Sequence, residues 1–148
     1  MKRLHLHMYV DDVAEAIGFY TDMLGESPCV TKSDYAKWLI DDPALNLAIS
    51  TKGHPGLSHL GIQAGERADL AAITQRLQQA DRKFWEQKNQ TCCYAVSDKT
   101  WVTDPAGVKW ESFFTMGASD TYYGVSGMEN DIEKSYADDE ERERRCCQ

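Results

Sequence analysis

The chain has 148 residues, of which 42% are hydrophobic and 27% charged, and its formal net charge is −8. This size and composition fit one globular domain with a real hydrophobic core. The acidic balance leaves no basic stripe for phosphates, which argues against a nucleic-acid partner. No apolar run approaches the roughly 20 residues of a membrane helix. The N-terminus lacks the pattern of a secretory signal, so we expect a cytoplasmic protein with no membrane partner.

The cysteine content indicates thiols rather than disulfides. The five cysteines are Cys29, Cys92, Cys93, Cys146 and Cys147. An odd count without a secretory signal argues against a disulfide framework. Adjacent cysteines rarely bridge each other, because the small ring strains the disulfide. We therefore expect both adjacent pairs to be dithiols, which can bind a soft ion through two sulfur atoms.

The first predicted strand, residues 3–10, alternates between two faces. Its apolar residues share one face, and His5, His7 and Tyr9 share the other. The apolar spacing that follows predicts a helix over residues 13–24. Three further strands are predicted at about 26–32, 35–41 and 45–51.

The same order of elements repeats after a cluster of helix and strand breakers at residues 52–56. Residues 57–64 predict a strand with His59 and Gly61 on one face. Residues 67–80 predict a helix with one apolar side. Four further strands are predicted at about 82–88, 92–96, 100–103 and 108–115.

These patterns predict an α+β fold in which the order strand–helix–strands occurs twice, in tandem modules at about residues 1–52 and 57–116. Both modules belong to one predicted domain, residues 1–116. Residues 117–148 are polar and acidic and contain the charge run DDEERERR. Such a run is typical of a solvated helix or a disordered segment, so we expect a flexible tail.

Two histidines and one glutamate stand out as metal ligands. His5, His59 and Glu111 lie on strand faces directed away from the core, at matching places in the two modules. Two imidazoles and one carboxylate suit Fe(II) with open positions for oxygen, and the same set serves zinc as a Lewis acid. The ligands alone do not select the metal, and His7 on the same face competes with His5. Each residue also has an ordinary interpretation, as a hydrogen-bonded histidine or a solvent-facing glutamate.

The adjacent thiols Cys92 and Cys93 are followed within eight residues by Lys99 and Trp101. A nearby lysine lowers a thiol pKa and favours the thiolate. Soft thiolates select soft acceptors such as Cd(II), Cu(I) or trivalent arsenic. The plain alternative is two small residues without chemistry. The second pair, residues 146–147, is either a capture arm for a metalloid or a pair without a role.

Three stretches of the chain resemble a known family. They are TCCYAVSDKTWVTDPAGVKWE at residues 91–111, SDYAKW at 33–38 and LSHLGI at 57–62. Together with the twofold module plan, they resemble the vicinal oxygen chelate superfamily. Within it they resemble the carbon–arsenic lyase branch, which also contains proteins described as cadmium-induced. The resemblance covers about residues 1–116. It implies two tandem strand–helix–strand–strand–strand modules that form a cleft-shaped mixed sheet.

The resemblance also implies an activity. It implies that His5, His59 and Glu111 bind Fe(II), with Ni, Co or Zn as substitutes in purified samples. It implies that Cys92 and Cys93 bind a small trivalent organoarsenical, such as methylarsonous acid or an aromatic arsenical. Oxygen is then the co-substrate and arsenite a product, and the loop that bears the thiols is expected to move. Further residues expected to bind substrate or line its pocket are Tyr94, Lys99, Trp101, Tyr35 and Phe113.

Two other functions stay open. The first is a cytosolic protein that sequesters cadmium or arsenite through its cysteine pairs and catalyses nothing. The second is a glyoxalase-like isomerase or thiol transferase that uses zinc or nickel, for which the cysteine pair is incidental. In every case we expect a monomer or a homodimer.

Overall fold

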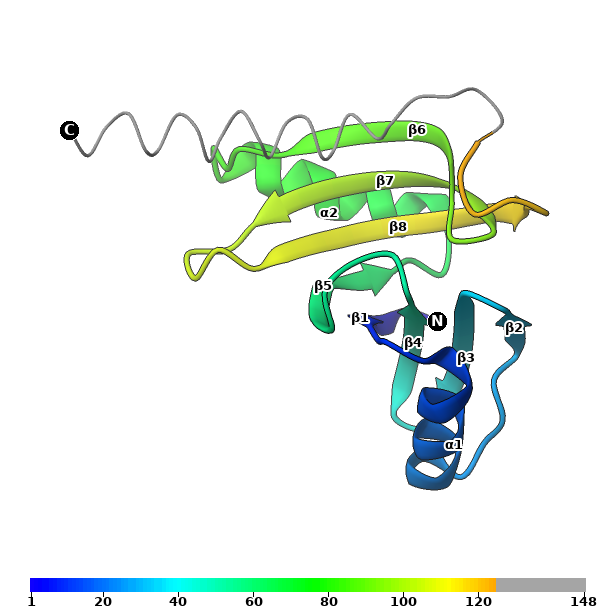
Figure 1. The fold of residues 1–148 in the computed structure, drawn as a ribbon. Coiled ribbons are helices and arrows are strands. Elements are labelled where there is room, and N and C mark those ends of the chain that lie inside the picture. The colour runs from blue at the N-terminus through cyan, green and yellow to red at the C-terminus, as the bar shows by residue number, and fades with distance from the viewer. Residues whose placement is uncertain (125–148) are drawn as a thin grey trace.

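Ten elements of secondary structure follow one another in a computed structural model that describes residues 1–124 (Figure 1). They are β1 (Arg3–Tyr9), α1 (Val13–Leu24), β2 (Val30–Lys32), β3 (Tyr35–Asp41), β4 (Ala44–Ser50), β5 (Gly56–Gln63), α2 (Arg67–Gln79), β6 (Trp85–Cys92), β7 (Ala95–Thr103) and β8 (Lys109–Ala118). Most of the predicted tail, including Cys146 and Cys147, lies outside the described residues. The division of the chain into a domain and a tail stays a prediction.

One eight-stranded sheet contains both modules, with the strand order β2-β3-β4-β1-β5-β8-β7-β6. β1 pairs in parallel with β4, and β5 pairs in parallel with β8. β1 and β5 pair antiparallel in the middle of the sheet. The two halves therefore repeat one connectivity about the β1–β5 pair, and the predicted α+β fold of two tandem modules is confirmed.

The pairing of β1 with β5 shows which residues of the two modules are equivalent. His5 lies opposite Gly61, and His7 lies opposite His59. A twofold axis between the two strands maps the His5–Gly61 pair onto the His59–His7 pair. His5 is therefore equivalent to His59, and His7 is equivalent to Gly61.

The helices cover the outer face of the sheet, with α1 on β3 and β4 and α2 on β7 and β8. The side chains beneath α1 are apolar, and those of Trp38 and Ile49 are fully buried. Asp12 caps α1 by accepting a hydrogen bond from the backbone N–H of Glu15, and Gly25 ends the helix in the left-handed conformation. Within residues 1–124, no helix combines the length and apolar character needed to cross a membrane.

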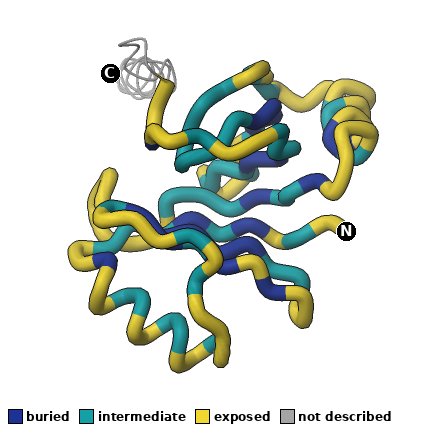
Figure 2. Tube along the Cα trace, turned by 90° about the vertical axis from the view of Figure 1, so that its right-hand side faces the viewer, coloured by how far each residue is buried: buried dark blue, intermediate teal, exposed yellow. Residues whose placement is uncertain are grey.

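The sheet curls around a hollow on its inner face. β3 and β6 lie near opposite ends of the strand order, yet Tyr35 on β3 and Ala48 on β4 pack against Tyr122 and the turn between β6 and β7. Buried positions concentrate in the strands, while loops and the outer sides of the helices are exposed (Figure 2). Buried polar side chains gather on the inner face: His5, His7, Asn46, Ser50, Lys99 and Glu111.

Two strand predictions in the second module are wrong. The predicted strands at 92–96 and 100–103 are replaced by β7, which runs unbroken over Ala95–Thr103, and residues 93–94 form the turn from β6. Two-residue hairpin turns favour Asn-Gly or Asp-Gly. Because Cys-Tyr is not such a pair, the pattern of residues did not reveal the turn.

A substitution at Gly61 tests the register between β5 and β8. A Cβ at Gly61 would lie 2.0 Å from the carbonyl oxygen of Glu111. Gly61→Ala should therefore force the strands apart and lower the free energy of unfolding by about 1–3 kcal/mol, measured by urea denaturation. Gly18→Ala in α1 is the control, since a Cβ there meets no atom within 4 Å and alanine favours a helix. Equal stability of Gly61→Ala and the wild-type protein would contradict the register.

Candidate active site

Three neighbouring strands bring the predicted metal ligands together. His5 on β1 lies opposite Gly61 on β5, and Gly61 lies opposite Glu111 on β8. Because Gly61 has no side chain, the imidazole and the carboxylate meet across it, with His5 Nε2 3.7 Å from Glu111 Oε2. His59 Nε2 is 3.3 Å from the same oxygen. The register thus gathers two imidazoles and one carboxylate from three strands.

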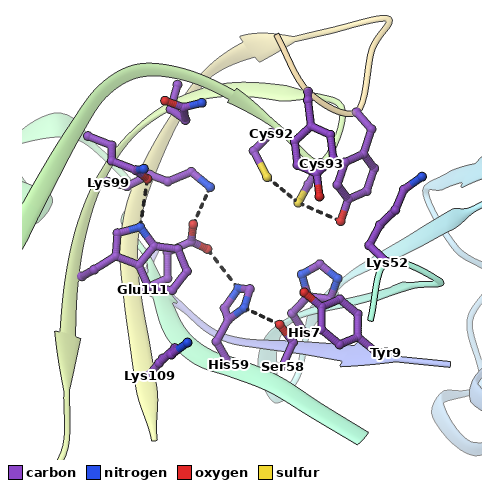
Figure 3. Close-up of a pocket in the computed structure, with 15 residues that line it drawn as sticks. His7, Tyr9, Lys52, Ser58, His59, Cys92, Cys93, Lys99, Lys109 and Glu111 are labelled. Carbon is purple, nitrogen blue, oxygen red and sulfur yellow. Dashed lines mark hydrogen bonds and ion pairs between the residues drawn. The ribbon is translucent and has the colours of Figure 1, made fainter. Parts of the chain in front are cut away.

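The two histidines are oriented by partners on their outer sides. His5 Nδ1 is 3.1 Å from the backbone oxygen of Asn46, and His59 Nδ1 is 3.0 Å from Ser58 Oγ. The Nε2 atoms are therefore turned toward Glu111, as Figure 3 shows for His59. His59 Nε2 is buried and lies 3.3 Å from Glu111 Oε2, but it does not have the geometry of a hydrogen bond to that oxygen. A histidine that binds a metal usually has one ring nitrogen held by a hydrogen bond and the other directed at the ion. His5 and His59 have this arrangement, so with Glu111 they fit a divalent ion.

A buried lysine balances the charge of the carboxylate. Lys99 Nζ is 2.5 Å from Glu111 Oε1, and the two side chains are only 7% and 5% exposed. Burial raises the pKa of Glu111, but Lys99 and the imidazoles outweigh it, so the pKa lies well below its ordinary value. Burial lowers the pKa of His5 to about 4, which keeps this imidazole in the neutral form that binds metals.

The cysteine pair sits at the turn between β6 and β7. Cys92 ends β6, and φ is 57° at Cys93 and 60° at Tyr94. This left-handed region costs a non-glycine residue about 1–2 kcal/mol. In an extended strand the two side chains would point to opposite faces. The turn instead brings the two sulfur atoms within 3.0 Å of each other.

The two thiols differ in their affinity for protons. The hydrogen bond from Cys93 lowers the pKa of Cys92 to about 7, and Lys99 adds to this effect while burial opposes it. The same contact, together with burial, raises the pKa of Cys93 well above its ordinary value. Above pH about 7 the pair therefore shares one proton, with the thiolate on Cys92. The effect of a nearby lysine is as predicted, although the neighbouring thiol contributes more.

The thiols and the predicted metal ligands line two cavities that share part of their walls. A cavity of about 230 Å³ is lined by His7, His59, Cys92, Cys93, Lys99, Trp101 and Glu111, among others. A smaller cavity of about 40 Å³ shares several of these residues and adds His5, Tyr35 and Phe113. In Figure 3 the thiols lie across the hollow from His59, with Lys99 and Glu111 along one side. A molecule held by the sulfur atoms would therefore face the metal ligands.

Trp101 forms part of the wall of this cavity. Its ring centroid is 5.1 Å from that of His59, and the ring stacks on Trp85. Its indole N–H donates to Gln87 at 3.0 Å. These contacts fix an apolar surface beside His59.

Tyr94 lines neither cavity, whereas Tyr122 and Ser50 lie beside the thiols. The Tyr94 hydroxyl donates to Asp34 at 2.7 Å and so ties the turn to the first module. The Cys93 thiol is 3.5 Å from the Tyr122 hydroxyl, which is 3.4 Å from Ser50 Oγ. Sequence patterns do not identify these neighbours, because Tyr122 follows the predicted domain end and a serine at the end of an apolar strand is ordinary.

The unequal thiols can be tested by alkylation with iodoacetamide. In metal-free protein, Cys92 should reach half of its maximal rate at pH about 7. Lys99→Met and Cys93→Ala should each move this midpoint upward, because each removes a group that stabilises the thiolate. Cys93→Ser is the matched control, since it keeps a hydrogen-bond donor. Peptide mass spectrometry separates Cys92 from the other cysteines, and a wild-type midpoint near the ordinary thiol pKa would contradict the assignment.

Comparisons with known proteins agree with this architecture. Residues 2–112 match the family model described as Glyoxalase/Bleomycin resistance protein/Dioxygenase superfamily. The chain is 34% identical over 124 residues to a trivalent organoarsenical cleaving enzyme of Thermomonospora curvata, with 82% of each chain covered. It is 35% identical over 133 residues to the cadmium-induced protein CadI of Mycobacterium tuberculosis, covering 88% of this chain and 87% of the relative.

Solved structures of homoprotocatechuate 2,3-dioxygenases share the fold. The enzyme of Brevibacterium fuscum has a TM-score of 0.57 at 19% identity, over 81% of this chain and 38% of its own. The enzyme of Arthrobacter globiformis has a TM-score of 0.56 at 17% identity, over 80% of this chain and 37% of its own. The sequence match, the relatives and the shared fold show that the chain belongs to the Glyoxalase/Bleomycin resistance protein/Dioxygenase superfamily, the vicinal oxygen chelate superfamily that its sequence resembles.

Proposed function

We propose that this protein cleaves the carbon–arsenic bond of trivalent organoarsenicals and releases arsenite, with Fe(II) as cofactor and oxygen as co-substrate. Methylarsonous acid and trivalent aromatic arsenicals are the proposed substrates. One observation carries the proposal: two sulfur atoms 3.0 Å apart open into the cavity that His59 and Glu111 also line. The name of the Thermomonospora curvata relative, an organoarsenical cleaving enzyme, supports this substrate class.

The cysteine pair binds the substrate in this proposal. A trivalent arsenical R–As(OH)₂ carries two hydroxyl groups, and each is displaced by one sulfur. Two arsenic–sulfur bonds form and two arsenic–oxygen bonds break. The two hydroxyls leave as water, one with the proton of Cys93 and the other with a proton from solvent. Cys92 attacks first as the thiolate, and Cys93 follows when it releases its proton. Soft sulfur suits soft trivalent arsenic.

His5, His59 and Glu111 are the residues that would hold Fe(II). Iron with this donor set supplies binding and activation of oxygen. Because sulfur holds the arsenic, the substrate needs no metal position of its own. Attachment to the turn above the ligands keeps the carbon–arsenic bond beside the reacting centre, which contributes to the rate through proximity.

Lys99 stabilises the site before substrate and metal arrive. Its ammonium group pairs with Glu111 at 2.5 Å and also favours the thiolate of Cys92. The ring of Trp101 closes the wall beside His59. These two residues therefore bind and orient, while the thiols and the metal ligands carry the chemistry.

Release of arsenite from methylarsonous acid tests the proposal. Protein loaded with Fe(II) under anaerobic conditions should release arsenite only after air is admitted. Cys92→Ser/Cys93→Ser and Glu111→Gln should each lower the rate about a hundredfold or more, because the reactants are no longer held together. Cys29→Ser is the control, since Cys29 is exposed and lines neither cavity. Chromatography coupled to mass spectrometry measures the arsenic species.

Three outcomes separate the proposal from its alternatives. Arsenite that appears without oxygen, or equally from the double cysteine variant, contradicts it. If the wild-type protein and Glu111→Gln bind the arsenical with equal affinity and neither releases arsenite, the protein is a scavenger. A glyoxalase-like isomerase would release no arsenite and would not need the cysteine pair.

A further inference from the structure

A third histidine, His7, belongs to the cluster of metal-binding residues. Its side chain is buried, and its ring centroid is 5.0 Å from that of His59 and 6.3 Å from that of His5. One ring nitrogen from each of the three histidines lies within 4.8 Å of the other two. Imidazoles on one ion have nitrogens about 3–4 Å apart, because each metal–nitrogen bond is about 2.1 Å. The three histidine nitrogens are therefore close to the spacing that one shared ion requires, and Glu111 reaches the same cluster through His5 and His59.

The register of the sheet places His7 in this position. His5 and His7 are two residues apart on β1 and so share its inner face. His7 lies directly opposite His59 on one side and opposite Ala48 on the other. The small side chain of Ala48 leaves room for the imidazole. In the second module the equivalent position is Gly61, so the extra imidazole comes from the first module alone.

His7 also has the outer hydrogen bond that is typical of a metal ligand. Its Nε2 is 2.9 Å from the hydroxyl of Ser50, which is fully buried. This contact leaves Nδ1 as the nitrogen that can bind an ion. The other two histidines are likewise held at one ring nitrogen. All three imidazoles therefore follow one scheme, in which one nitrogen is fixed from outside and the other is available to a metal.

A structural role alone accounts poorly for this placement. Burial of an imidazole costs free energy unless its nitrogens find partners. An apolar side chain at position 7 would fill the space above Ala48 without this cost. A shared ion supplies a partner for the second nitrogen and so offsets the cost.

We propose that His7 is a fourth protein ligand, so that the metal in this chain is held by three imidazoles and one carboxylate. The inference rests on the metal centre of the proposed function. A six-coordinate ion then keeps two open positions instead of three. Two are enough when the arsenical is held by sulfur and only oxygen needs to bind. The added nitrogen also favours metals that suit imidazole, which include Fe as well as Ni, Cu and Zn.

The same ligand is connected to the substrate-binding thiols. From His7 Nε2 a chain of polar contacts runs through Ser50 Oγ and Tyr122 Oη to Cys93 Sγ, with steps of 2.9, 3.4 and 3.5 Å. Figure 3 marks the contact between Cys93 and the tyrosine hydroxyl, with His7 nearby. Through these contacts, a change in the hydrogen bonding of Cys93 can reach Ser50, the residue that orients the His7 ring.

Co(II) is the probe that tests the role of His7. Full-length metal-free protein is loaded under anaerobic conditions, and X-ray absorption counts the imidazoles on the metal. We expect three in the wild-type protein and two in His7→Ala. The dissociation constant for Co(II), measured by competition with a chelator, should rise about tenfold or more in His7→Ala. Ser50→Ala should raise it in the same direction, because it frees the ring of His7.

His54→Ala is the matched control, because His54 is an exposed histidine in the loop between β4 and β5. It also removes one imidazole and should leave the dissociation constant unchanged. Two imidazoles in the wild-type protein, a spectrum dominated by sulfur, or unchanged affinity in a folded His7→Ala would each overturn the inference. If His7→Ala does not fold, the imidazole count of the wild-type protein decides.

Arsenite release by the Fe(II)-loaded wild-type protein is measured separately. Three imidazoles without arsenite release would support His7 as a ligand and reject the proposed function. Two imidazoles on the metal together with arsenite release would support the proposed function and reject His7 as a ligand.

Discussion

The close approach of three strands at Gly61 is the constraint on which the rest of the site depends. This residue pairs with His5 on one side and with Glu111 on the other, and it contributes no side chain between them. The imidazole and the carboxylate can therefore meet across β5, and His59, two residues earlier on β5, completes the set. The twofold repeat of the modules supplies the matching histidines. The differences between the modules, Gly61 against His7 and Glu111 against Ala48, make the centre asymmetric.

The site is held in a state that costs free energy. A buried carboxylate is stabilised by a buried ammonium, and two non-glycine residues adopt positive φ so that two sulfur atoms meet. Removing one partner of a buried ion pair usually costs several kcal/mol, so Lys99 and Glu111 depend on each other in the absence of metal. Backbone strain and buried charge of this kind are typical of functional sites, which is consistent with the proposed role of the thiol pair beside the candidate metal ligands. The hydroxyl of Tyr94 on Asp34 holds the strained turn in place.

Much of the fold follows from local patterns, whereas the cavity does not. Alternation in residues 3–10 is enough to direct His5 and His7 away from the core, and the repeated order of elements is enough to match His5 with His59. The turn at Cys93 could not be predicted, because its backbone angles are set by the hairpin and not by turn chemistry. The contact of Tyr122 with Ser50 depends on the curl of the sheet, which brings together segments that are far apart in strand order. Contacts such as this one are set by the pairing of distant strands and not by the types of the residues involved.

The central claim is that the metal ligands and the thiol pair form one centre. An anaerobic crystal structure of the protein with Fe(II) and methylarsonous acid, with anomalous scattering recorded at the iron and arsenic edges, tests it most directly. We predict an iron peak bonded to His5, His59 and Glu111, and an arsenic peak bonded to both Cys92 and Cys93 in the same cavity. Iron bound elsewhere, or arsenic bound only by the cysteines at 146 and 147, would contradict the account.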